Sequence, residues 1–179
     1  MKKQHVKKVP MVMQLEALEC GAACLAMVLA YYNKWVPLEQ VRVDCGVSRD
    51  GSKAKNLARA ARSYGLAVSA YRMSPEALRE QADYPCILHW NMNHFVVLCG
   101  FQKDCAVLND PARGTVRVSL EEFDQSFTGL CLTFATGEGF VRSGKRKSTL
   151  EFASRRLRGA GPAEVVFHAS IEHILDFLF

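Results

Sequence analysis

The 179-residue chain lacks, as far as Phe134, any run of the roughly 20 apolar residues that a membrane-spanning helix needs. Its N-terminus, MKKQHVKKVPMVMQLEAL, also lacks the apolar core of a secretory signal peptide, because Pro10, Gln14 and Glu16 interrupt it. A Walker A phosphate-binding motif is absent as well. These absences predict a protein that stays in the cytoplasm, and they give no sign of a nucleotide-binding domain.

Disulfide and metal-binding patterns are also missing. The seven cysteines are odd in number and show no repeated spacing, so a reducing compartment fits better than secretion. Cys20 and Cys24 form a C-x₃-C pair with no second pair at a convenient distance, and we expect no zinc site. Acidic and histidine residues near the C-terminus do not form H-E-x-x-H and are expected on a solvated helix face: His168, Glu172, His173 and Asp176. We therefore expect no metal and no cofactor.

The excess of basic residues is confined to one short segment. The net charge is +5, but residues 1–140 contribute only +2, residues 141–158 contribute +6 and residues 159–179 contribute −3. Clustered Lys and Arg attract nucleic acid and anionic lipid alike. Because the segment has no recognisable nucleic-acid-binding motif, we expect no nucleic-acid partner and interpret it as a linker or a membrane-facing segment.

Length and charge together predict one domain with appended segments, since 49% of the residues are hydrophobic and only 23% are charged. The predicted parts are a basic N-terminal arm (1–8), a globular domain (9–137), a basic linker (138–162) and an apolar or amphipathic tail (163–179). The tail either begins a truncated membrane domain or ends a stand-alone protein.

Helical patterns come before strand patterns along the chain. Small and apolar residues from Ala22 to Ala30 predict a buried helix that begins at Cys20. Further short helices are predicted at residues 37–44, within DGSKAKNLARAARSYGL before Gly65, and at SPEALREQ, each with a proline or serine start or a glycine stop.

From Cys86 onward the pattern changes to short apolar runs: CILHW, HFVVLCGF, CAVLND and TVRV. Such runs predict a meander of antiparallel strands. After a short helix capped by Ser119, LCLTF is predicted as a last strand. Helices first and a sheet afterwards indicate an α+β fold.

Cys20 directly precedes Gly21 at the predicted start of the buried helix. Unpaired backbone N–H groups and the positive end of the helix dipole stabilise a thiolate at such a position. The alternative is that Cys20 is a small buried hydrophobe, as most intracellular cysteines are. A catalytic cysteine would need a base within hydrogen-bond reach and a third group that orients the base.

His94 is the best placed of the five histidines to be that base, because it opens a strand and can face a cleft. His5 lies in the basic arm, His89 in an apolar run, and the other two beyond the globular part. The sequence LND ends the next strand, and hairpin partners lie about 5 Å apart, so Asp110 or Asn109 can reach the imidazole. The alternatives are a turn histidine and an Asx turn.

Several stretches, in order and spacing, resemble the C39 (double-glycine) peptidase domain of bacterial peptidase-containing ABC transporters: VPMVMQLEALECGAACLAMVLAYY, SRDGSKAKNLARAARSYGL, NHFVVLCGF, LNDPARG and SLEEFDQSFTG. The resemblance covers about Val9 to Phe134. It looks closest to the branch that handles nitrile-hydratase-like or Nif11-like leaders. It implies a papain-like fold, in which a helical subdomain carries the cysteine and an antiparallel sheet carries the histidine and the acid.

The resemblance also implies a role for each site residue. Cys20 matches the nucleophile, His94 the general base and Asp110 the residue that orients the histidine. Gln14 would donate its side-chain amide to the oxyanion, together with a backbone N–H at Cys20. Many members have Asp where this chain has Glu19, a change that leaves the triad intact.

The implied activity is that of a cysteine endopeptidase, a hydrolase that removes the leader of bacteriocin- or lanthipeptide-type precursors after Gly-Gly or Gly-Ala, coupled to export at the inner face of the plasma membrane. Gly21 and Ala22 are expected to leave room for the substrate backbone. The implied partners are a precursor with a helical leader and the membrane and ATPase domains of a transporter, to which ATP and Mg²⁺ would be confined. Two alternatives remain: a C39-like domain that only docks leaders, and a cysteine transferase or amidase on a papain-like scaffold.

Overall fold

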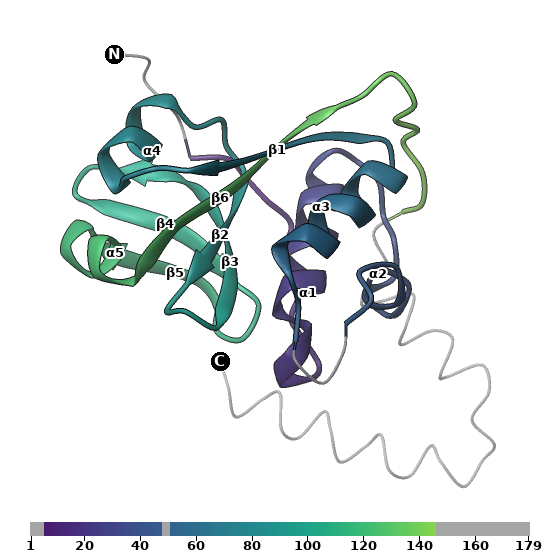
Figure 1. The fold of residues 1–179 in the computed structure, drawn as a ribbon, viewed down its shortest axis with the longest axis horizontal. Helices are drawn as coiled ribbons and strands as arrows, with labels where there is room; N and C mark the ends of the chain where they lie inside the picture. Colours follow the sequence, from purple (N-terminus) through teal and green to yellow (C-terminus); the bar gives the residue numbers. More distant parts are fainter. Residues whose placement is uncertain (1–5, 48–50, 146–179) are drawn as a thin grey trace, which may run out of the picture. The chain divides into compact units, whose positions relative to one another are not determined.

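The computed structural model describes residues 6–47 and 51–145, and in these ranges helices precede a sheet (Figure 1). A 3₁₀ turn, η1 (Ala17–Glu19), leads into α1 (Cys20–Tyr31), which is followed by α2 (Leu38–Asp44) and α3 (Ala54–Ser63). The predictions for the basic segment beyond 145 and for the tail at 163–179 fall outside these ranges, as do those for His5, His168 and His173. Within the described part, no helix is long and apolar enough to cross a membrane.

Helix α1 is buried on all sides, since every residue from Cys20 to Ala30 is shielded from solvent. Its small side chains allow neighbouring elements to approach closely on every face. Helices α2 and α3 instead bury one face each, and each is followed by a glycine in the left-handed region, Gly46 (φ +57°) and Gly65 (φ +90°). The predicted glycine stops are therefore confirmed.

The strands form one six-stranded antiparallel sheet in the order β1-β6-β2-β3-β4-β5. Strands β2 (Cys86–Trp90), β3 (His94–Gln102), β4 (Cys105–Asp110) and β5 (Gly114–Ser119) make the predicted meander. Strand β6 does not continue it. After α5 (Leu120–Ser126), β6 (Phe127–Thr136) crosses back and lies between β2 and β1 (Leu66–Arg72). The sequence predicted a last strand here but not its neighbours, because strand periodicity carries no information about pairing between distant segments.

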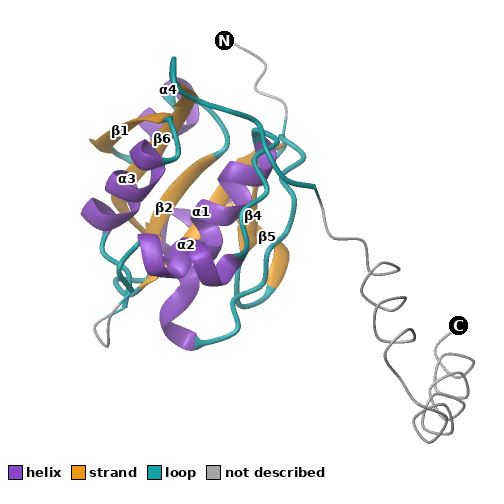
Figure 2. Cartoon of the chain, turned by 90° about the vertical axis from the view of Figure 1, so that its right-hand side faces the viewer, coloured by secondary structure: helices purple, strands orange, loops and turns teal. Residues whose placement is uncertain are grey.

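Both faces of the sheet are covered. The helices α1, α2 and α3 lie on one face, as Figure 2 shows, and Ile87, Val97 and Leu132 pack there with Leu25 and Leu57. On the other face, α4 (Pro75–Gln81) and α5 contribute Leu78 and Phe123 to a second cluster: Leu88, Trp90, Val96, Leu98 and Leu108. Burial on both faces explains why β2 and β3 are nearly continuous apolar runs.

The segment before η1 is tied to the sheet at three points. Lys7 N donates to Cys99 O (2.8 Å), the Asn109 side chain donates to Val9 O (3.0 Å), and Gln14 N donates to Pro111 O (2.9 Å). The segment that follows β6 runs back to the helices, where Trp35 N donates to Ser143 O (2.8 Å). These contacts fix the N-terminal segment next to the end of β4.

Replacing Met92 by glycine should stabilise the protein slightly. In the turn between β2 and β3, Asn91 (φ +45°) and Met92 (φ +65°) both adopt left-handed backbone angles, and the Met92 side chain is 78% exposed. Relief of about 1–2 kcal/mol of steric strain outweighs the roughly 0.5–1 kcal/mol entropic cost of a glycine. We expect the free energy of unfolding to rise by about 0.5 kcal/mol in a urea titration.

The exposed Val141, which has no left-handed angle, supplies the matched control. Val141→Gly should lower the free energy of unfolding, because glycine raises the conformational entropy of the unfolded chain and relieves no strain in the folded one. An equal loss of stability in Met92→Gly and Val141→Gly would refute the prediction.

Candidate active site

Cys20 is the first residue of α1 and is 5% exposed, so it lies at the helix start that the sequence predicts. Cys24, one turn later, is fully buried, and its thiol donates to Phe95 O at 3.3 Å. Burial raises the pKa of the Cys24 thiol well above its ordinary value, which makes that thiol unreactive. Of the two cysteines in α1, only Cys20 has a reactive partner.

That partner is His94, which opens β3 next to the end of β4. Its Nε2 lies 2.9 Å from Asp110 Oδ1, which leaves Nδ1 as the ring nitrogen available to the Cys20 thiol. A hydrogen bond to Cys20 raises the pKa of His94, and the Asp110 carboxylate adds to this effect against the opposing effect of burial. Of the two candidate partners, Asp110 and Asn109, it is Asp110 that reaches the imidazole. Asn109 bonds instead to Val9 O and Thr115.

Asp110 is almost completely buried, yet it stays ionised. Burial by itself would raise its pKa, but His94, Arg113 Nε (2.7 Å) and Ala112 N (2.9 Å) all donate to the carboxylate and bring the net pKa below its ordinary value. The bond from Ala112 N is that of an Asx turn. Asp110 therefore makes the Asx turn and also bonds to His94. Sequence reasoning missed Arg113, because nothing in the stretch LNDPARG marks this arginine as a partner of the acid three residues before it.

Gln14 is held beside this acid, since its backbone N–H bonds to the carbonyl of Pro111, the residue after Asp110. Its side-chain Oε1 is the one buried side-chain oxygen or nitrogen without a hydrogen-bond partner among the described residues. No hydrogen bond within the described ranges uses its Nε2. The amide therefore remains available as a donor to a ligand.

The expectation for Gly21 and Ala22 was wrong. A Cβ on Gly21 would come within 2.5 Å of Ser52 Cβ, and Ala22 is completely buried. The space next to Gly21 is filled by the loop before α3, so it is not free for a substrate. Glycine is needed here because another segment of the same chain packs against the start of α1.

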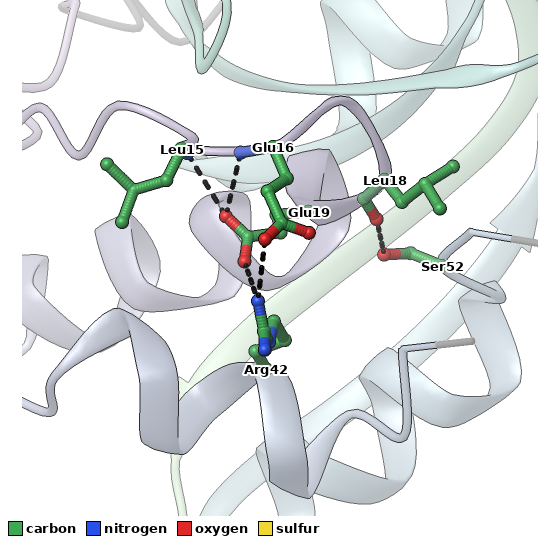
Figure 3. A network of polar contacts seen from close by, with 6 residues as sticks. All are labelled: Leu15, Glu16, Leu18, Glu19, Arg42 and Ser52. Atoms are coloured by element: carbon green, nitrogen blue, oxygen red, sulfur yellow. Dashed lines mark hydrogen bonds and ion pairs between the residues drawn. The ribbon is translucent and has the colours of Figure 1, made fainter. Parts of the chain in front are cut away.

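Glu19, the residue before Cys20, is buried as well (Figure 3). Its carboxylate accepts the N–H groups of Leu15 and Glu16 and pairs with Arg42 from α2 at 2.7 Å. Sequence reasoning identified Glu19 as part of a motif but found neither its buried position nor its partner.

The other histidine in the sheet stays apart from this site. His89 Nδ1 lies 2.8 Å from Thr128 Oγ1, and burial lowers its pKa. Within residues 6–47 and 51–145, no group of three or more His, Cys, Asp or Glu side chains could hold a metal ion. The candidate site therefore rests on His94, which is bonded to Asp110 and whose pKa is raised by the Cys20 thiol.

Replacing Asp110 by asparagine should lower the pKa of His94. The variant keeps the shape of the side chain but removes the negative charge that favours the imidazolium form. We expect NMR titration to give His94 a pKa above its ordinary 6.5 in the wild type and a lower value in Asp110→Asn. A pKa that is unchanged or higher in the variant would contradict the geometry.

The same shift fixes the sign of the pH dependence of stability. A raised folded-state pKa means that the stability His94 gains from Cys20 and Asp110 is fully present below about pH 6.5 and is lost as the pH rises through the folded pKa. Asp110→Asn should weaken this dependence.

Residues 8–139 match the peptidase C39 family. The fold is similar to that of a double glycine motif protease from an AMS/PCAT transporter, solved in complex with the leader peptide, with 63% identity, a TM-score of 0.74 and coverage of 75% of this chain and 96% of that chain. It is also similar to the peptidase domain of Streptococcus ComA, a bifunctional ABC transporter, with 26% identity, a TM-score of 0.67 and coverage of 74% and 99%.

Two curated relatives come from Escherichia coli. The colicin V secretion/processing ATP-binding protein CvaB is 37% identical over 134 residues, and the probable microcin-H47 secretion/processing ATP-binding protein MchF is 35% identical over 135 residues. Each match covers 75% of this chain but only 19% of the relative. The chain therefore matches about a fifth of the length of these relatives.

Proposed function

Because the chain belongs to the peptidase C39 family, we propose that it is a cysteine endopeptidase that cleaves the leader from bacteriocin- or lanthipeptide-type precursors after Gly-Gly or Gly-Ala. One observation carries the proposal. His94 Nε2 lies 2.9 Å from Asp110 Oδ1, and the neighbouring thiol of Cys20, the first residue of a buried helix, raises the pKa of the imidazole. This supports a nucleophile, a base and a residue that orients the base, a set that a domain that only docks leaders does not need.

Each residue then has one task in the reaction. His94 takes the proton of the Cys20 thiol, and the thiolate attacks the carbonyl carbon of the second small residue. Asp110 stabilises the imidazolium that forms. The imidazolium gives its proton to the leaving amine, and the amide bond breaks to leave a thioester on Cys20. Water, deprotonated by His94, hydrolyses that thioester and regenerates the thiol.

The oxyanion of each tetrahedral intermediate needs hydrogen-bond donors. We assign this task to the side-chain amide of Gln14 and the backbone N–H of Cys20. The support is that Gln14 Nε2 has no partner within the described residues and that the backbone of Gln14 is tied to Pro111, beside the acid. Charge that develops in a site already supplied with donors is stabilised without reorganisation.

The proposed partners follow from the relatives. The protease solved with a leader peptide is 63% identical to this chain, and CvaB and MchF are secretion and processing proteins that bind ATP. The proposed substrate is a precursor whose helical leader ends in a double-glycine motif, of the nitrile-hydratase-like or Nif11-like kind. The membrane and ATPase domains of a transporter would hold ATP and Mg²⁺ and bring the peptidase to the inner face of the membrane.

Mass spectrometry of a synthetic leader-Gly-Gly-core peptide tests the proposal directly. The protein should cut after the second glycine and should fail on a matched peptide in which that glycine is valine. Binding of both peptides is measured in parallel by fluorescence anisotropy of a labelled leader. Binding without cleavage would overturn the peptidase assignment in favour of a docking domain, and equal cleavage of both peptides would overturn the double-glycine specificity.

A further inference from the structure

Two carboxylates are buried among the described residues, Asp110 and Glu19, each 2% exposed. Burying a carboxylate is costly unless it is paired and hydrogen-bonded. Asp110 meets this cost while orienting His94. Glu19 has no hydrogen bond to His94 among the described residues. Its role therefore has to be inferred from the groups that it does bind.

The Glu19 carboxylate binds two backbone groups and one cation. Its Oε2 accepts the N–H of Leu15 at 3.0 Å and of Glu16 at 3.1 Å, and its Oε1 accepts Arg42 Nη1 at 2.7 Å. Burial works against ionisation, but the bond from Arg42 and the two backbone bonds outweigh it, and the net pKa of Glu19 lies below its ordinary value. Glu19 is therefore an ionised acceptor around which the chain folds.

These bonds close a turn with a proposed functional residue at each end. Leu15 directly follows Gln14, and Glu19 directly precedes Cys20. Figure 3 shows the Glu19 side chain pointing back along the chain toward Leu15 and Glu16, with Arg42 reaching it from the opposite side. Gln14 is thus held by Glu19 through Leu15 and by Pro111 through its own N–H.

Arg42 is the member of this network that comes from elsewhere in the chain. It lies on α2, its side chain is 43% exposed, and it also approaches Glu16 Oε1 at 3.5 Å. Because it donates to Oε1, it leaves Oε2 free for the two backbone N–H groups. Without Arg42, the buried carboxylate would lose its only cationic partner among the described residues and would be driven toward solvent, away from the turn.

We propose that Arg42 is a positioning residue: acting through Glu19, it holds the turn from Gln14 to Cys20 and thereby sets the place of the oxyanion donor relative to the nucleophile. The inference rests on the proposed peptidase function. Because a misplacement of about 1 Å at a reacting centre costs about 10²-fold in rate, Arg42→Met should lower kcat by about 10- to 100-fold. KM should change by less than about 2-fold, since the positioned donor acts on charge that exists only in the transition state and the intermediates.

Steady-state kinetics on the leader-Gly-Gly-core peptide test this with three variants. Arg42→Met removes the cation but keeps an extended side chain, and Arg42→Lys restores a donor and should recover most of kcat. Arg79→Met is the matched control, because Arg79 pairs with Asp124 at 2.5 Å between α4 and α5, on the opposite face of the sheet from α2. Arg79→Met should keep wild-type kcat. Thermal unfolding shows whether each variant is folded at the assay temperature.

Hydrogen exchange separates this inference from the function on which it rests. The amides of Leu15 and Glu16 should lose protection in Arg42→Met and keep it in Arg79→Met. An unchanged kcat in folded Arg42→Met, a loss that only follows the unfolded fraction, or retained protection at these two amides would each overturn the positioning role. Absence of cleavage by the wild type would overturn the proposed function, and the exchange measurement would still decide whether Arg42 holds the turn.

Discussion

Replacing Cys20 by alanine should abolish cleavage of the leader-Gly-Gly-core peptide while leaving leader binding intact. The side chain is 5% exposed and small, so the substitution removes a sulfur without opening a large cavity. Loss of the nucleophile in a comparable hydrolase costs about 10⁶-fold in kcat. We expect no product by mass spectrometry within the limit of detection, and an unchanged dissociation constant for a labelled leader.

Cys24 gives a close control, because it lies one turn further along the same helix and is also buried. Cys24→Ala loses a weak hydrogen bond to Phe95 O and some packing, so it should lower the melting temperature by a few degrees, roughly 1 kcal/mol. It should keep cleavage near the wild-type rate. Cleavage at the same bond by Cys20→Ala would show that another group is the nucleophile, and equal losses in both variants would point to packing of α1.

Much of the local structure follows from the sequence, because its causes lie within a few residues. The small and apolar composition of residues 22–30 predicts a helix buried on every side, and that is how α1 lies. Ser74 and Ser119 accept the N–H of the third residue of the helices they precede, α4 and α5, as their spacing indicates. Such caps satisfy backbone groups that the helix itself leaves unpaired.

The position of β6 did not follow, because it depends on contacts between distant segments. Residues 130–136 of β6 pair with β1, more than 50 residues earlier, and four residues of β6 pair with β2. The predicted meander, β2 to β5, has short connections, whereas β6 follows α5 and pairs with β2 on the other side of the meander. Strand pairing of this kind is decided by which apolar faces remain to be covered, which periodicity along one strand does not show.

The same distinction applies to the candidate site. The hairpin predicted Asp110 or Asn109 as the partner of His94, because both lie about 16 residues away on the neighbouring strand, and the family resemblance pointed to Asp110. The pair of Arg42 and Glu19 could not be predicted, because the two residues lie 23 positions apart on different elements. An arginine on a helix surface has no feature that marks it as the partner of a particular acid. Gly21 was assigned the wrong neighbour for this reason too, since Ser52 reaches it from another loop.

Replacing Gln14 by alanine should reduce kcat by about 10²- to 10³-fold, or about 3–4 kcal/mol, which is the cost of losing one preorganised oxyanion donor. KM should change little, because the donor acts on charge that exists only in the transition state and the intermediates. The protein should remain folded. Gln14 Oε1 is buried without a partner among the described residues, so truncating this side chain removes an unfavourable group rather than a stabilising one.

Gln14→Glu sharpens this test, because it keeps the length of the side chain and places a negative charge where the oxyanion develops. Its kcat should fall at least as far as that of Gln14→Ala, whereas a residue that mattered only for packing would tolerate glutamate better than alanine. Normal turnover by Gln14→Ala would exclude the oxyanion role. An unpaired buried carbonyl is rarely kept in a native protein without a function, and here it belongs to an amide whose nitrogen has no partner among the described residues and whose backbone is tied to Pro111, the residue after Asp110.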